Sequence, residues 1–177
     1  MGQIKPPMGD GSLGLHAGNA SSKVSFGNQV RWVGDELSTI DLVSYWVFTT
    51  GENIGAAPAG NVNLVNFQVE VNPHLNGRTY STLVYLPVQS VPGWKEQDAS
   101  NEARWYFTGG TGTDTGCNEV TYCTLADAKA AAPAATILTV QLNKGRDWAF
   151  TGAVDALRIN DSIFDFGPTG VAEVPAT

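Results

Sequence analysis

The alternation of side chains near the C-terminus constrains the fold more than any other stretch of the chain. Asp155, Leu157 and Ile159 stand at every second position, so an extended backbone would place them on one face. The pair at 160–161 is Asn-Asp, which is typical of a turn, and residues 162–166 alternate again. We therefore expect an antiparallel hairpin in which Leu157 and Ile159 are buried and share their strand face with an acidic side chain.

Other short extended segments occur along the whole chain. The clearest hairpin joins residues 62–71, which are apolar at every second position, to residues 80–88 through a turn at 72–77. Residues 41–50 are apolar on both faces, which favours a central strand over a short buried helix. Further strands are expected at 11–16, 23–26, 93–98, 103–107 and 136–142, and residues 30–33 fit either a strand or a loop.

One helix is expected, near residues 125–132. Thr124 can cap its first turn, and Asp127 occupies the position of the acid in a capping box. Residues 51–60 and 108–116 are rich in glycine and small side chains, so we expect loops there.

Roughly ten strands joined by turns, with one short helix, predict an all-β fold. The expected architecture is a two-sheet antiparallel β-sandwich of the jelly-roll type. A chain of 177 residues suits one domain, so we assign residues 1–177 to a single sandwich. Residues 1–10 are expected to form an N-terminal arm, because Pro6 and Pro7 prevent regular ladder pairing.

Composition narrows the classes of partner. Only 15% of the residues are charged and the net charge is −7, which argues against nucleic-acid binding and favours neutral partners. The chain has no apolar run of about 18 residues, so insertion into a membrane is not expected. Its first residues lack the apolar core of a signal peptide, and we expect a secreted protein whose leader has been removed.

Three stretches carry a resemblance to known proteins: residues 6–13, residues 41–45, and residues 152–159 together with 164–166. In this order they resemble jelly-roll modules of secreted bacterial proteins, similar to carbohydrate-binding modules. The resemblance implies a non-catalytic extracellular domain, often one part of a larger protein. In many such modules an acid in the last strand helps to hold a structural calcium ion. Asp155 has that position, and Asp10 is the acid near the N-terminus that could join it. The alternative is that Asp155 binds no ion and accepts hydrogen bonds from backbone N–H groups or from a neighbour such as Arg158.

A neutral polysaccharide is the expected ligand, because flat aromatic side chains stack on sugar rings while amides and carboxylates bond the hydroxyl groups. The aromatic residues in polar or glycine-rich contexts are the candidates for that contact: Trp32, Trp105, Tyr106 and Trp148. The alternative for each is a place in the core, where most large aromatic side chains are found.

Two other functions fit the sequence. The first is a structural or adhesive domain of a cell surface or filament, whose partner is another surface protein or another copy. The second is a glycoside hydrolase that uses Glu96 and Asp98, which would share one strand face at a Cα spacing of about 7 Å. Exposed aromatic side chains would favour the glycan-binding module over both.

The two cysteines, Cys117 and Cys123, predict a disulfide. They enclose a short loop and lack the further cysteine and histidine neighbours of a zinc site. We expect the native chain to weigh two hydrogens less than the reduced chain in mass spectrometry. Two thiols that react freely with an alkylating agent in the native protein would contradict the bond.

Overall fold

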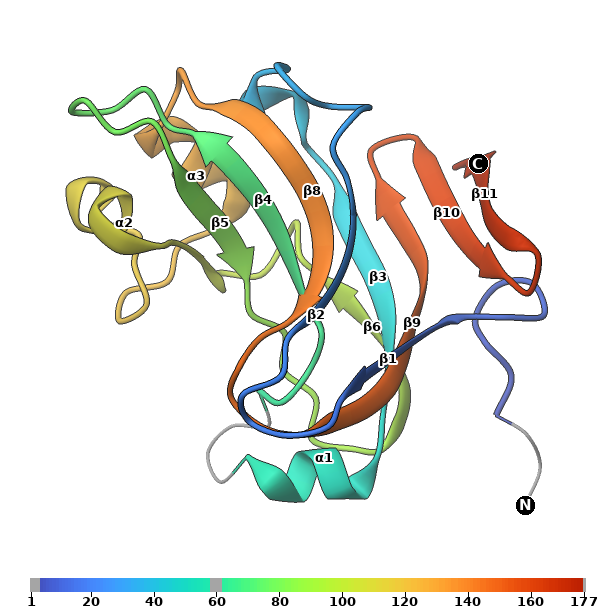
Figure 1. The fold of residues 1–177 in the computed structure, drawn as a ribbon. Coiled ribbons are helices and arrows are strands. Elements are labelled where there is room, and N and C mark those ends of the chain that lie inside the picture. The colour runs from blue at the N-terminus through green and yellow to red at the C-terminus, as the bar shows by residue number, and fades with distance from the viewer. Residues whose placement is uncertain (1–3, 58–61, 177) are drawn as a thin grey trace.

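The protein is a sandwich of two antiparallel β-sheets (Figure 1). The computed structural model describes residues 4–57 and 62–176. The six-stranded sheet has the order β11-β10-β9-β3-β6, with β1 paired to β9, and the five-stranded sheet has the order β2-β8-β4-β5-β7. The all-β, two-sheet architecture is therefore confirmed.

The strands of the six-stranded sheet are β1 (Leu13–Ala17), β3 (Val43–Thr49), β6 (Gly93–Asp98), β9 (Phe150–Ile159), β10 (Ser162–Gly167) and β11 (Gly170–Pro175). Those of the five-stranded sheet are β2 (Val24–Asn28), β4 (Asn66–Asn72), β5 (Ser81–Tyr85), β7 (Trp105–Phe107) and β8 (Thr136–Lys144). The predicted hairpins between β4 and β5 and between β9 and β10 are both present. The N-terminal arm contains no helix or strand from residue 4 to residue 10.

The centre of the core is a cluster of four fully buried aromatic side chains, Tyr45, Phe67, Tyr85 and Trp105. Tyr45 comes from the six-stranded sheet and packs against Phe67 and Tyr85, which come from the five-stranded sheet. Its hydroxyl donates a hydrogen bond of 2.9 Å to the carbonyl of Val65. Each of these rings removes a large apolar area from water, so the cluster contributes much of the force that holds the sheets together.

The predicted helix is present as α3 (Leu125–Ala131), and Thr124 and Asp127 form the expected capping box. Two further helices occupy segments that were expected to be loops, α1 (Gly51–Ala56) and α2 (Gly109–Thr115), so the loop predictions are wrong there. Residues 58–60 of the first predicted loop lie outside the described residues. In α1 tertiary contacts override weak helix propensity. The buried Asn53 side chain donates to Thr49 Oγ1 and to the carbonyl of Thr151, which ties the helix to both neighbouring strands.

The prediction that Asp155 shares a strand face with Leu157 and Ile159 is wrong, because β9 contains a β-bulge. Asp155 pairs with Trp46 and Arg158 pairs with Ser44, so two residues of β9 stand opposite one residue of β3. Ala156 lies in the bulge with a φ of 48°. The extra residue turns Asp155 to the outer face of the sheet, whereas Leu157 and Ile159 are buried as expected, at 8% and 2% exposure.

The Cys117–Cys123 disulfide is present and closes the loop between α2 and α3. β11 was not foreseen and adds an edge strand beside β10. None of the helices in the described ranges is long and apolar enough to cross a membrane.

Ala156 provides a test of the bulge. A left-handed backbone costs a non-glycine residue about 1–2 kcal/mol, and glycine would remove this cost. The greater conformational freedom of glycine in the unfolded chain lowers stability by about 0.4–1 kcal/mol and offsets part of the gain. We expect Ala156→Gly to raise the free energy of unfolding by up to about 1 kcal/mol in urea titrations. Ala153→Gly in the regular part of β9 is the control and should lower it by about 0.5–1 kcal/mol. Equal losses at both positions would contradict the bulge.

Candidate functional site

Polar side chains cover the outer face of the five-stranded sheet where β4 and β8 lie side by side. Residues of β4 alternate between buried apolar and half-buried polar side chains, and the polar ones point away from the core. The pairing of the two strands sets Gln68 opposite Gln141 and Glu70 opposite Thr139. Amide and carboxylate groups therefore form two adjacent cross-strand pairs on one surface.

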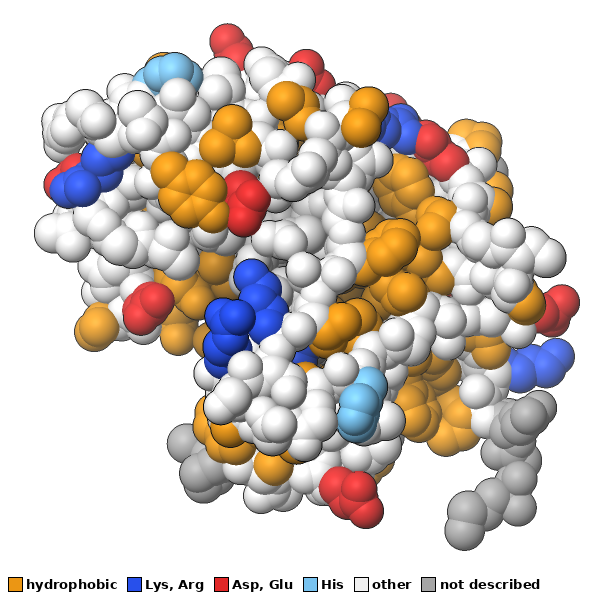
Figure 2. Space-filling view, viewed as in Figure 1, with side chains coloured by type: hydrophobic (Ala, Val, Ile, Leu, Met, Phe, Trp, Pro, Cys, Tyr) orange, Lys and Arg blue, Asp and Glu red, His pale blue; other side chains and the backbone are white. Residues whose placement is uncertain are grey.

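Hydrogen bonds join these side chains to a tyrosine. Gln141 Nε2 donates to Gln68 Oε1 at 3.1 Å, and Thr139 Oγ1 donates to Glu70 Oε2 at 2.9 Å. The Tyr80 hydroxyl donates to Glu70 Oε1 at 2.9 Å, while its side chain remains 56% exposed. We call Gln68, Glu70, Tyr80, Thr139 and Gln141 the polar face. Most of the surface over β4 and β8 is neither charged nor hydrophobic (Figure 2).

Two open cavities adjoin the polar face. One, of about 340 Å³, lies beside β2 and is lined by Ser25, Gln29, Glu70, Thr139 and Gln141 among others. The other, of about 440 Å³, lies beyond Tyr80 and is lined by Asn76, Arg78 and the loop before α2. Tyr80 lines the second cavity and its hydroxyl donates to Glu70, which lines the first, so this hydrogen bond joins the walls of the two cavities.

The four aromatic candidates from the sequence do not form a common site. Trp105 is fully buried and its indole nitrogen donates to the carbonyl of Ala99, so its expected place at the surface is wrong. Tyr106 is half-buried on β7 and packs against Tyr122 at 5.9 Å. Trp148 is half-buried after β8, and Trp32 lies at an apolar pocket between the sheets.

The two acids of the hydrolase hypothesis lie on β6, at the edge of the six-stranded sheet. Both Glu96 and Asp98 are exposed. Asp98 accepts hydrogen bonds from the backbone of Ser100 and from the Asn101 amide, which is the pattern of a turn. Neither acid lines the two cavities beside the polar face or the apolar pocket between the sheets.

Asp155 holds the N-terminal arm against the sheet. Its Oδ2 accepts a 2.9 Å hydrogen bond from the backbone nitrogen of Met8, and its Oδ1 accepts one from Phe166. Burial raises the pKa of this carboxyl, and the charge of Asp165 raises it further. The carboxyl of Asp165 lies against Gly9, and its Oδ1 is buried with no hydrogen-bond partner among the described residues.

The carboxylates of Asp155 and Asp165 could bind a hard cation, because one of their oxygens lacks a hydrogen-bond donor. A buried carboxylate oxygen without a donor, beside a second carboxylate, is costly unless a positive charge neutralises it. Asp10, the other predicted ligand, is exposed. In the described residues no group of three or more His, Cys, Asp or Glu side chains gathers at a metal-binding distance, so backbone oxygens would have to complete a calcium shell.

The site that sequence reasoning missed is the polar face. Its signal was present, because the alternation in residues 62–71 leaves Gln68 on the strand face opposite Phe67 and Val69, whereas the sequence prediction included only aromatic side chains as ligand contacts. Comparison of the chain with models of protein families, with curated proteins and with solved structures found no match.

Proposed function

We propose that the protein is a non-catalytic module that binds a neutral polysaccharide along the polar face. The observation that carries the proposal is the network in which Glu70 accepts hydrogen bonds from both Tyr80 and Thr139. Sugar hydroxyls both donate and accept, so a surface of amides, hydroxyls and one carboxylate offers them partners of either kind. The exposed ring of Tyr80 offers an apolar surface to a sugar ring beside these groups.

The size of the surface suits a short stretch of a chain. Together with the cavity beside β2 it extends from β2 across β8 and β4 to Tyr80, which directly precedes β5 in the same sheet. Neighbouring strands lie about 4.8 Å apart, so the surface is about 14 Å wide. Because the cavities at both ends are open, a polysaccharide could continue past the polar face in either direction.

A binding role is favoured over hydrolysis by the number of carboxylates near this surface. Glycosidases place two carboxyl groups about 5–9.5 Å apart across the bond that they cleave. Among the described residues that line the two polar cavities, Glu70 is the single carboxylate. An extracellular place for the module is part of the proposal, and the disulfide is compatible with it.

A structural or adhesive role is the second candidate, because β11 is exposed along most of its length at the edge of its sheet. Glu173 and Pro175 lie on this strand, however, and a charge and a proline are the usual protection against edge-to-edge pairing. Glu173 is also engaged in an ion pair with Arg31 of the same chain. These features give the adhesive role less support than the glycan-binding role.

Calcium would have a structural role in this proposal. Asp155 and Asp165 are the residues that would hold the ion, against the backbone of Met8 and Gly9. The ion would supply positive charge to the two carboxylates. The N-terminal arm would then be fastened to β9 and β10 by the ion as well as by hydrogen bonds.

The calcium proposal is tested by metal removal. A ligand at about 100 times its dissociation constant stabilises the native state by about 2.7 kcal/mol. At about 2–4 °C per kcal/mol, EDTA should lower the melting temperature by about 5–10 °C relative to millimolar calcium. Asp165→Asn should reduce this difference, whereas Asp161→Asn, in the exposed turn between β9 and β10, should retain it. Identical melting in EDTA and in calcium would remove the ion from the proposal.

The glycan proposal is tested by titration calorimetry with neutral hexasaccharides of glucose, xylose and mannose. For the sugar that binds, Gln141→Ala and Tyr80→Ala should each weaken binding about tenfold or more, since a lost hydrogen bond or stacking contact costs about 1–2 kcal/mol. Tyr80→Phe keeps the ring and should lose less. Val120→Ala, at a side chain that is 93% exposed in the disulfide loop, is the control. Binding that survives both alanine variants would place the site elsewhere.

A further inference from the structure

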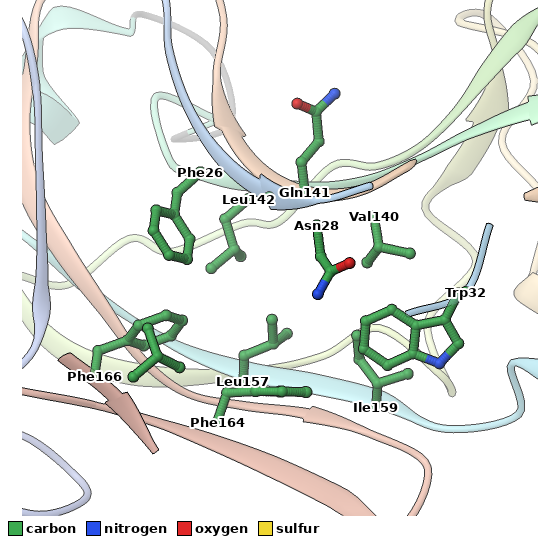
Figure 3. Close-up of a pocket in the computed structure, with 12 residues that line it drawn as sticks. Phe26, Asn28, Trp32, Val140, Gln141, Leu142, Leu157, Ile159, Phe164 and Phe166 are labelled. Carbon is green, nitrogen blue, oxygen red and sulfur yellow. The ribbon is translucent and has the colours of Figure 1, made fainter. Parts of the chain in front are cut away.

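A second pocket lies inside the sandwich, between β2 and β8 of one sheet and β9 and β10 of the other (Figure 3). Its volume is about 190 Å³. Leu142, Leu157 and Ile159 form its apolar walls. Figure 2 shows hydrophobic side chains exposed between β2 and β10, where the pocket opens to solvent. The polar face is on the other side of the five-stranded sheet, so the two sites are separate.

Two aromatic pairs hold the sheets apart on either side of this pocket. Phe26 meets Phe166 edge to face at 5.6 Å, and Trp32 meets Phe164 at 5.9 Å in the same manner. Each pair joins the segment around β2 to β10. The pocket lies in the space between the two pairs, and all four rings line it.

The volume of the pocket limits the size of a molecule that can bind in it. A cavity of about 150 Å³ lined by leucine, isoleucine and phenylalanine stays dry and accepts benzene. The present pocket is slightly larger and has the same kind of lining. One aromatic ring with a short substituent, or a branched alkyl group of similar size, would fit it.

Asn28 supplies a directed hydrogen-bond donor. Its Oδ1 accepts hydrogen bonds from the backbone nitrogens of Val30 and Arg31, at 2.7 and 2.8 Å. These bonds fix the orientation of the amide, and its nitrogen points into the pocket (Figure 3). No acceptor within the described residues bonds this nitrogen. Asn28 is exposed at the rim of the pocket, so a carbonyl or ether oxygen of an occupant would take the place of water on this nitrogen.

The positive charge nearest to these rings, that of Arg31, is already paired within the chain. Its guanidinium lies over the rings of Trp32 and Phe164, at 5.0 and 5.6 Å from their centres. The same group pairs with Glu173 and donates to Ser162. Since this charge already has a partner, a neutral occupant fits better than a carboxylate.

We propose that this pocket binds a small neutral molecule or substituent made of one apolar ring or branched alkyl group and an oxygen acceptor. The ring fills the space between the two aromatic pairs, and the acceptor meets Asn28 Nδ2. This inference does not rest on glycan binding at the polar face, and each can fail without the other.

The probes are acetophenone, which has the acceptor, and ethylbenzene, which lacks it. Both are titrated into the full chain by NMR, with the Asn28 side-chain amide and the Trp32 indole as reporters. Acetophenone should bind about two- to tenfold more tightly, because its oxygen accepts a hydrogen bond from Asn28 Nδ2 that ethylbenzene cannot accept. Asn28→Asp keeps the acceptor of the backbone turn and removes the donor. This variant should lose the preference for acetophenone and still bind ethylbenzene.

A blocking variant localises the binding. Val171 lines the opening and is 48% exposed on β11, so Val171→Trp should cover the opening without disturbing the core. It should reduce the affinity of both probes at least tenfold, whereas Tyr80→Ala on the polar face should change neither. The proposal is overturned if neither probe binds at millimolar concentration, or if Asn28→Asp keeps the preference. It is also overturned if binding dissociates a dimer in sedimentation, which would assign the opening to a second copy of the chain.

Discussion

The packing of two sheets around one aromatic cluster is the constraint on which the rest of the structure depends. Tyr45 reaches from the six-stranded sheet into the space between Phe67 and Tyr85 of the other sheet. Successive side chains of a strand point to opposite faces of the sheet. The residues that precede and follow each ring of this cluster therefore point away from the core. The polar face on β4 and β8 is the outward consequence of the same alternation that builds the core.

The sheets pack differently on the side of the sandwich where β2 faces β10. In place of a continuous aliphatic core, two edge-to-face aromatic pairs span the gap and leave a pocket between them. Arg31 bridges the mouth through its contacts with Trp32, Phe164 and Glu173. The protein thus has two chemically distinct surfaces on opposite sides of one sheet: the polar face, where we propose that a glycan binds, and the apolar pocket, where we propose that a small neutral molecule binds.

The bulge in β9 links the core to the N-terminal arm. One extra residue reverses the side of the strand, so Asp155 leaves the core face while Leu157 and Ile159 keep their places in it. The Asp155 carboxylate then accepts a hydrogen bond from the backbone nitrogen of Met8, and the N-terminal arm covers it. A buried acid therefore lies on the outer face of a sheet, because a segment from the other end of the chain covers it.

The sequence by itself determined the class of fold, the β4–β5 and β9–β10 hairpins, the capped helix α3 and the disulfide. Each of these depends on local spacing: alternation at period two, a capping box within four residues, or two cysteines around a short loop. The tertiary structure alone decided the bulge at Ala156, the helices α1 and α2, the burial of Trp105, and the grouping of Glu70, Tyr80, Thr139 and Gln141. These features depend on which strands become neighbours. Residues such as Glu70 and Thr139 meet across 69 positions of sequence, a distance at which local patterns carry no information about pairing.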